Sequence, residues 1–504
     1  MTTYDTKWHP ASEPAPDRKA SRTLARLMSR PLTRREILKR AAAGATAAGV
    51  GAAFGQPAIA AAGKRDRVAI VGAGAGGIAA AYFLADTHRV DVFESNSAIG
   101  GHCDSRVIDY EGTPVTVDLG AQFFHPDTHP LYVTLLEELG LYDPANPNSG
   151  KTRAWPGSLC VFPLGGGAPR FTSTRPLETV QNTVGFAQFT QLARQAVLDG
   201  LAYEVTVAEW IASLPLEDSF KADVLLPWIT ATIGCSADDA ARTSARSILQ
   251  TFALAFPEDP TSGALTYTSR IGLQGNLKRM LDRVPSAKLH RLAAVSGLTR
   301  GREGWTLTTS AGRRGPYRYV VMNAPPHISR RLLRPLPGFG KLADLLGEYR
   351  YFDSRILVHT DPAYVHPDRA NWTAYNAGVS GEESEGSAWM GALTDPLPSG
   401  ATVDVFKSWA ERRPADPQRV LIERGFKHPL ITQRTIAAAR GLQRQQGRHG
   451  LYFSGSYTTG TDLQETALYS AMKVAEQLAP RSRNLRSLRK RMRANGIAGI
   501  SYEL

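Results

Sequence analysis

The sequence is poor in cysteine and has a moderate content of charged residues. Cys103, Cys160 and Cys235 are the only cysteines among 504 residues, too few for a disulfide framework or a paired-cysteine zinc site. Hydrophobic residues make up 42% and charged residues 21%, which excludes a disordered or fibrous chain. This length predicts two or three domains of about 100–200 residues each, with cores that depend on burial alone.

Positive charge is concentrated at the two ends of the chain. The formal net charge is +13, and residues 1–60 and 481–504 each carry +6 of it. Residues 61–480 are therefore close to neutral, at +1. This distribution argues against a nucleic-acid-binding protein, because such a protein places its cations on the folded surface that meets phosphate.

Residues 1–60 form an amino-terminal extension that is typical of an export signal. Arg34 and Arg35 stand shortly before a stretch made almost wholly of Ala and Gly, which resembles a twin-arginine signal peptide. A small-residue cleavage site at 58–60 makes Ala61 the expected new amino terminus. We therefore expect recognition by the twin-arginine export machinery and a periplasmic or extracellular location. A flexible linker is the alternative interpretation.

A strand, a glycine-rich turn and a helix follow one another directly after residue 66. The run 67–71 is largely β-branched, and the turn after it holds the residues expected to bind a dinucleotide: Gly72, Gly74, Ala75, Gly76 and Gly77. Glycines here permit a tight turn, a close approach to the pyrophosphate and close helix–strand packing. A second strand over 89–93 ends in Glu94, 22 residues after Gly72, where an acid binds a ribose hydroxyl. The spacing predicts a Rossmann-type site.

The loop after Glu94 favours FAD over NAD as the cofactor. The Glu94 carboxylate would repel a 2′-phosphate, and Ser95 beside it is a further candidate for cofactor binding. Gly100 and Gly101 allow a second close approach to phosphate, which resembles the second FAD fingerprint of glutathione-reductase-like flavoproteins. His102 follows directly and is a candidate both for cofactor contact and for proton donation.

Later segments resemble the flavin amine oxidase superfamily. The similar stretches are 115–124, 275–277, 292–295, 319–326 and 450–468, and the match spans roughly residues 66–480. A closer resemblance, through 351–361, is to bacterial proteins described only as predicted NAD/FAD-binding proteins. The resemblance implies that the Val295 backbone contacts the adenine side of FAD. It also implies that the final segment binds FAD through Gly455, Ser456, Glu465, Thr466 and Ala467.

The resemblance implies an α/β fold, with a Rossmann-type, glutathione-reductase-like FAD-binding domain and an inserted mixed α+β substrate domain. The expected FAD-binding parts are 64–118, 265–328 and 436–480. The expected substrate-domain parts are 119–264, which has a helical pattern, and 329–435. A basic tail over 481–504 follows.

Two positions depart from the classical amine oxidases. Arg355 stands where those enzymes usually have a lysine that holds a water near flavin N5, and Leu463 stands where they often have an aromatic-cage tyrosine. Tyr457 could still supply an aromatic wall. The candidate catalytic residues are therefore Arg355, Tyr457 and His102.

No metal site is expected. His125 and His129 are four residues apart, but prolines at 126 and 130 argue against the continuous helix that would bring both side chains to one metal ion. The tail from Arg481 to Arg493 alternates apolar residues with cations. This pattern is typical of a solvated tail or of peripheral contact with an anionic membrane.

The resemblance implies an exported FAD-dependent oxidoreductase. Its substrate would be a small organic molecule, an amine or amino acid, which transfers a hydride to flavin N5, and oxygen would reoxidise the flavin. The two departures leave open a flavin-dependent desaturase or isomerase of unsaturated lipids. A non-catalytic flavin-binding carrier or sensor is the third interpretation.

Overall fold

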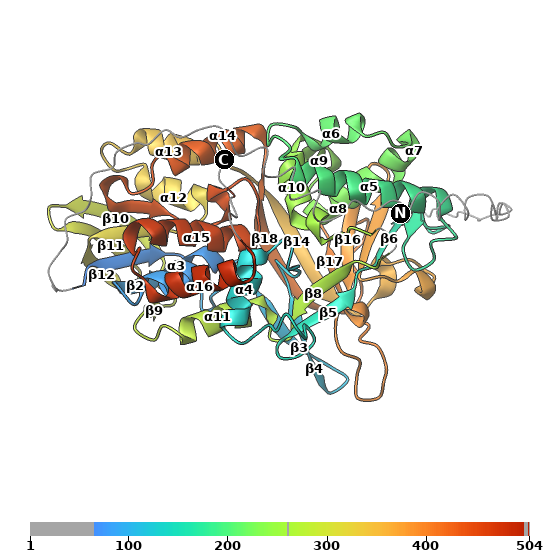
Figure 1. The fold of residues 1–504 in the computed structure, drawn as a ribbon, viewed down its shortest axis with the longest axis horizontal. Helices are drawn as coiled ribbons and strands as arrows, with labels where there is room; N and C mark the ends of the chain where they lie inside the picture. The colour runs from blue at the N-terminus through green and yellow to red at the C-terminus, as the bar shows by residue number, and fades with distance from the viewer. Residues whose placement is uncertain (1–64, 260–261, 498–501, 503) are drawn as a thin grey trace, which may run out of the picture.

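The computed structural model describes residues 65–259, 262–497, 502 and 504, and the predicted export signal lies outside these residues. The described chain forms two regions side by side along its long axis (Figure 1). One region is built around a parallel five-stranded sheet and the other around a mixed seven-stranded sheet. The fold is α/β with a Rossmann-like part, as predicted.

The parallel-sheet region contains five strands in the order β19-β13-β1-β2-β9. Their bounds, in that order, are Leu451–Phe453, Tyr319–Met322, Arg67–Val71, Arg89–Phe93 and Lys288–His290. β1 and β2 confirm the two strands predicted from the sequence. Helices cover both faces of this sheet and bury its side chains, which explains its β-branched composition.

Five helices share the largest core cluster with one face of the parallel sheet. They are α3 (Ala75–Leu84), α4 (Pro130–Glu138), α11 (Gly272–Asp282), α15 (Gln464–Leu478) and α16 (Arg483–Ala494). All but the first residue of α3 are buried, because the helix is enclosed between the sheet and α15. Its Ala- and Gly-rich sequence permits this close packing on all sides.

The basic tail is a helix that packs on the protein. Leu485, Leu488 and Met492 of α16 are buried in the same core cluster as α3 and α4. The amphipathic pattern therefore reflects packing on the body of the protein. Arg489 and Arg491 pair with Glu476 and Glu137 of the neighbouring helices. Among the described residues, no helix combines the length and apolarity needed to cross a bilayer.

The opposite face of the parallel sheet carries an antiparallel three-stranded sheet and three helices. The strands are β10 (Val295–Gly301), β11 (Gly304–Thr309) and β12 (Gly312–Tyr317), and the helices are α12 (Pro326–Leu333), α13 (Gly340–Leu346) and α14 (Gln433–Gln443). Trp305, Leu307 and Tyr317 anchor the three-stranded sheet in a second core cluster.

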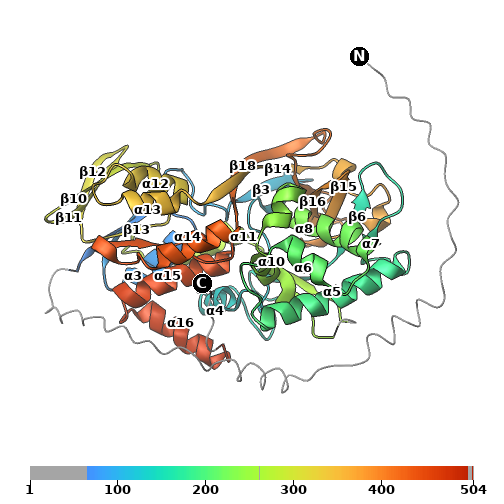
Figure 2. The ribbon, with the colours of Figure 1, turned by 90° about the horizontal axis from the view of Figure 1, so that it is seen from above.

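The mixed-sheet region has the strand order β18-β14-β17-β16-β15-β6-β7. The bounds, in that order, are Val420–Leu430, Arg350–His359, Phe406–Trp409, Glu383–Trp389, Tyr375–Ser380, Leu159–Pro163 and Phe171–Thr172. The long strands β14 and β18 lie between the two regions (Figure 2). The helical pattern predicted within 119–264 is confirmed by α5 (Val180–Leu198), α6 (Val207–Ser213), α7 (Asp218–Phe220), α8 (Leu226–Ile233), α9 (Ala237–Arg242) and α10 (Ala245–Phe252).

Two small sheets complete the fold. β3 (Ser105–Tyr110) pairs with β4 (Thr113–Asp118), and β5 (Thr152–Pro156) pairs with β8 (Leu265–Ser269). β8 lies within the stretch 265–328 that the sequence assigned to the FAD-binding domain. Tyr267 of β8 is buried in the core cluster that includes one face of the parallel sheet.

We expect Leu488→Ala in α16 to lower the free energy of unfolding by about 2–5 kcal/mol, because it leaves a cavity in the main core. Arg486→Gln on the exposed side of the helix is the control and should change stability by less than about 0.5 kcal/mol. Urea unfolding of both variants measures the difference. Equal effects would show that α16 does not contribute to the core.

Candidate functional site

The turn between β1 and α3 depends on glycine at two positions. Gly72 has a φ of +102°, a left-handed backbone conformation that favours glycine. A β-carbon at Gly77 would overlap the carbonyl oxygen of Gly72. Gly74 caps α3 without a side-chain hydrogen bond, and the first helical turn carries no acidic residue. The positive end of the helix dipole is therefore available to an anion.

A second glycine loop lies directly against the first. Gly100 and Gly101 both have positive φ values, +117° and +61°, and the Gly100 amide donates to the Ala73 carbonyl at 2.8 Å. A β-carbon at Gly101 would lie 3.4 Å from the Gly74 α-carbon. The structure thus brings together the two glycine loops that the sequence assigned to phosphate binding.

The third predicted segment meets the same turn. The Ser454 hydroxyl donates to the Gly76 carbonyl at 3.1 Å, and a β-carbon at Gly76 would lie 3.0 Å from the Gly455 α-carbon. Ser456 is hydrogen-bonded to the Asp462 carboxylate. Residues separated by nearly 380 positions therefore form one cradle with the glycine loops.

Asn323 joins these segments, and the sequence analysis did not select it as a site residue. Its side-chain oxygen accepts from the Gly77 amide at 2.6 Å, and its side-chain nitrogen donates to the Ser454 carbonyl at 2.9 Å. Asn323 lies just beyond the carboxyl end of β13. The sequence did offer a signal for this residue: it is polar and directly follows a strand, and ligands bind at the carboxyl ends of parallel strands.

Glu94 lies at the end of β2 with its carboxylate buried. One oxygen accepts from the Ala73 amide at 2.8 Å, and the other accepts from Asn96 and from the Ser95 hydroxyl at 3.1 Å. Its backbone carbonyl accepts from the Ala293 amide, which places the start of β10, at Val295, close by. Glu94, Ser95 and Val295 therefore lie on one side of the glycine cradle.

The last predicted cofactor residues, Glu465, Thr466 and Ala467, contact other parts of the protein in this structure. The Glu465 carboxylate is fully buried and accepts from the Leu131 and Tyr132 amides at 3.1 and 2.7 Å, at the start of α4. Burial raises the pKa of Glu465 to about 7. The Thr466 hydroxyl bonds the Thr461 carbonyl. Ala467 is buried in α15.

Arg355, a predicted catalytic residue, makes ion pairs at the protein surface. Its guanidinium pairs with Asp416 at 2.6 Å and with Glu423 at 2.9 Å, both on exposed carboxylates. Arg355 lies on β14, and its side chain projects toward these surface acids. Tyr457 lies beside the cradle: its hydroxyl donates to the Met322 carbonyl at 2.6 Å, and a β-carbon at Gly455 would lie 2.8 Å from its ring.

His102 lies in a cluster of rings at the boundary between the two regions. Its imidazole stacks on that of His428, with ring centroids 4.9 Å apart. The Phe352 ring also stacks on His428, at a centroid distance of 5.5 Å. The Nε2 atom of His428 is buried and has no hydrogen-bond partner among the described residues. Burial holds the pKa of His428 well below its usual range, so the ring is neutral at pH 7.

Asp462 brings a carboxylate to this pair of histidines. Potential ligand atoms of His102, His428 and Asp462 lie within 4.8 Å of one another, so the group could hold a divalent cation or exchange protons with a bound molecule. His125 and His129 form no such group: burial lowers the pKa of His129 to about 3, and α4 begins only at Pro130.

Lys407 carries a partly buried amine that the sequence analysis missed. It lies on β17, and its Nζ donates to the Gly120 carbonyl at 2.9 Å. Burial lowers the pKa of Lys407 to about 8, against the opposing effect of Asp118. Burial also raises the pKa of Asp118 to about 6, and its carboxylate accepts from the Leu273 amide. Lys407 thus links the mixed sheet to the segment that follows β4.

Cys103 follows His102 but is chemically protected. Its side chain is buried, and burial raises the pKa of the thiol to about 12. Because the thiolate is the reactive form of cysteine, this residue is suited to packing and not to covalent chemistry.

Comparison with known proteins supports the fold. Residues 70–139 match the model of an NAD(P)-binding Rossmann-like domain. Similar solved structures include a protein from Exiguobacterium sp. 255-15 whose assignment as a protoporphyrinogen oxidase is provisional, with 15% identity, a TM-score of 0.57 and coverage of 82% of this chain and 98% of that one. A search of curated proteins found no match.

Two further solved structures have a similar fold, with comparable sequence identities and TM-scores. A fatty acid isomerase of P. acnes that produces conjugated linoleic acid (CLA) has 14% identity and a TM-score of 0.56, over 82% of this chain and 99% of its own. Putrescine oxidase bound to putrescine has 16% identity and a TM-score of 0.54, over 83% and 99%. These similarities show a shared fold that occurs in proteins with different reactions, and they do not select one of these reactions.

We expect Lys407 to make stability depend on pH. The folded state releases the Lys407 proton near pH 8, whereas the unfolded state keeps it to about 10.5. Between these values the unfolded state binds more protons, so the stability of the native protein relative to Lys407→Met should rise with pH. Urea unfolding between pH 7 and 10 measures this difference.

Lys341→Met is the matched control, because Lys341 is exposed at the start of α13. Its stability relative to the native protein should not change over the same range. A difference between native protein and Lys407→Met that stays constant from pH 7 to 10 would contradict a partly buried, shifted amine.

Proposed function

We propose that the chain is an FAD-dependent oxidoreductase, and the observation that carries this proposal is the convergence of three chain segments on one glycine cradle. A single glycine turn would suit NAD equally well. The second loop, at Gly100 and Gly101, and the third segment, at Gly455, favour the larger FAD molecule. The solved oxidases and the isomerase of similar fold support this choice.

The residues of the cradle fit a dinucleotide. The uncapped start of α3 can receive the negative charge of a pyrophosphate. Gly74 and Gly101 leave room for close approach of the phosphates. The Glu94 carboxylate could accept hydrogen bonds from ribose hydroxyls in place of those it now accepts from the Ala73 and Asn96 amides. Bound FAD would supply a two-electron acceptor for a hydride from carbon.

The protein would exclude water and control protons at the boundary between the two regions. The neutral His428 ring has a free, buried nitrogen that can accept a proton or hydrogen-bond from a bound substrate. Lys407, with a pKa of about 8, can donate or accept one near neutral pH. We propose a small amine or amino acid as the substrate and oxygen as the final acceptor.

A flavin-dependent desaturase or isomerase of unsaturated lipids is the second candidate. It is favoured by the positions of Arg355 and Leu463, since neither supplies the lysine or aromatic cage of classical amine oxidases. Lys407 and the His102–His428 pair instead place nitrogen donors at the boundary, which suits a carboxylate better than an ammonium group. A carrier or sensor without turnover is the third candidate.

We also propose export by the twin-arginine route, because that route accepts proteins that have already folded around a cofactor. The mass of the protein recovered outside the cytoplasm should correspond to a chain that begins at Ala61. A recovered chain that still contains Arg34 and Arg35 would contradict this proposal.

The first test is flavin content in the protein from Ala61 onward. The native protein should show an oxidised-flavin spectrum, and Gly74→Ala should weaken FAD binding about 5- to 100-fold, the effect of one crowded methyl group. A methyl group at Gly74 fits the protein itself, 3.4 Å from the Asn323 side-chain oxygen, so misfolding is not expected. Gly340→Ala, at an open position, is the control. Native protein without flavin would overturn the proposal.

The second test is anaerobic titration of the flavin-loaded protein with amines, amino acids and unsaturated fatty acids. Bleaching of the flavin band by an amine or amino acid supports the oxidase. A shifted double bond in a fatty acid without net flavin reduction supports the isomerase. Bound flavin that no compound reduces or uses would favour the carrier and contradict both enzymes.

A further inference from the structure

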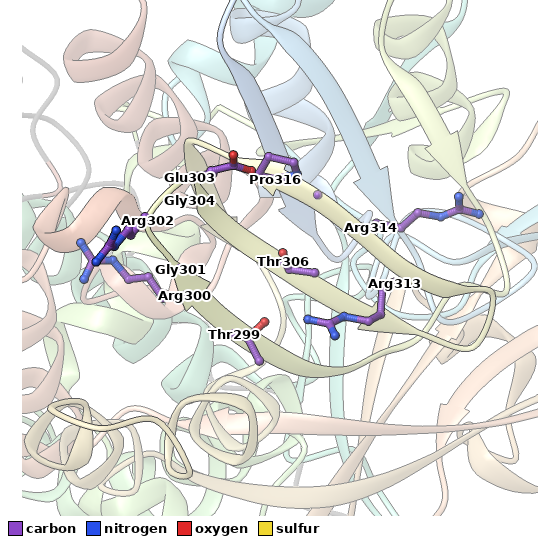
Figure 3. A pocket seen from close by; sticks show the side chains of 11 residues that line it. Thr299, Arg300, Gly301, Arg302, Glu303, Gly304, Thr306, Arg313, Arg314 and Pro316 are labelled. Carbon is purple, nitrogen blue, oxygen red and sulfur yellow. The ribbon is translucent and has the colours of Figure 1, made fainter.

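A basic cavity lies on the three-stranded sheet of the parallel-sheet region. Its volume is about 510 Å³, and its lining includes Arg300, Arg302, Arg313 and Arg314 together with the hydroxyls of Thr299 and Thr306. Figure 3 shows Arg313 extending over the sheet toward the two threonines, whereas Arg314 extends away from them. The cavity shares no residue with the glycine cradle.

The lining of this cavity carries more positive than negative charge: Glu303 is its one acidic residue, against four arginines. Five arginines and one glutamate lie between residues 295 and 318, within a body that is nearly neutral. Arg318 pairs with Asp66 at 3.2 Å. Within the part of the chain that the structure describes, the four cavity arginines have no ion pair. Like charges on one surface repel one another, and a bound anion would offset that repulsion.

The backbone holds the arginines in a fixed arrangement. Arg300 pairs with Trp305 across β10 and β11, and Arg313 pairs with Thr308 across β11 and β12. The Trp305 side chain is 1% exposed, and its indole nitrogen donates to the His449 carbonyl at 3.0 Å. Trp305 and Leu307 hold one face of the sheet in the core, and Arg300 and Arg314 pair with these two residues. Arg313 pairs with Thr308 and therefore lies on the other face, which also carries Thr299 and Thr306.

A break in strand register shapes the hollow. The pairing of β11 with β12 shifts between Trp305 and Leu307. Gly315, at the shift, has a φ of +153°, and a β-carbon there would lie 2.7 Å from the Trp305 carbonyl oxygen. Such a bulge bends a strand and redirects its side chains. Here it lies beside Arg313 and Arg314, where the cavity forms.

We propose that this cavity binds a ligand that carries at least two phosphate groups. Guanidinium groups bind phosphate oxygens through paired hydrogen bonds, and threonine hydroxyls add further donors. The volume lies within the range of small-molecule sites. The phosphates could belong to a free molecule or to lipid headgroups. This inference is independent of the proposed flavin chemistry.

The test uses the flavin-loaded protein from Ala61 onward and sodium pyrophosphate as the probe. Calorimetry should show one saturable site, whose affinity falls as NaCl is raised from 50 to 200 mM. Arg300→Gln combined with Arg313→Gln should weaken it at least about tenfold. The control combines Arg486→Gln with Arg493→Gln. Both residues are exposed on α16, and the same charge loss there should leave affinity within about twofold.

A second arm separates the two sources of phosphate. Sedimentation with phosphatidylglycerol vesicles that is lost in the Arg300→Gln, Arg313→Gln variant, without saturable pyrophosphate binding, would assign the site to lipid headgroups. Saturable pyrophosphate binding would assign it to a free ligand. Equal losses in the cavity variant and the α16 control, or no binding in either arm, would overturn the proposal.

Discussion

The parallel-sheet region depends on the two hydrogen bonds made by one side chain, that of Asn323. Its amide joins the start of α3 to the carbonyl after β19, and thereby connects chain segments that are far apart in sequence. Both bonds are short and partly buried, so losing either would leave a backbone group without a partner. Glycine is also required at position 77, because a β-carbon there would overlap the Gly72 carbonyl oxygen and separate α3 from β1.

Local geometry explains why the first part of the site could be predicted from sequence. Gly72, Gly77 and Glu94 act within one strand–turn–helix–strand unit, so their spacing along the chain determines their positions in space. The same holds for Gly100 and Gly101. Nothing beyond about 35 residues of chain is needed to bring these groups together, and the structure places them as the spacing indicates.

The chemistry at the boundary between the regions could not be predicted in the same way. Arg355 and Lys407 lie on paired antiparallel strands, and which of them faces inward depends on strand register and bulges that the sequence does not specify. Alignment by motif selected Arg355, but its side chain meets surface acids. The inward cation is Lys407, one strand away. His428 was missed as a site residue because it lies far from His102 in the sequence, and the two rings meet only in the folded chain.

Burial at this boundary favours the uncharged form of each group whose pKa it shifts. It lowers the pKa of Lys407 and of His428 and raises those of Asp118 and the Cys103 thiol. Such shifts require a surrounding of low polarity on both sides of the boundary. A hydride is transferred most readily where water is excluded and protons are held on groups with pKa values near the working pH. The packing of the two regions thus supplies the environment that the proposed reaction needs, whichever substrate it serves.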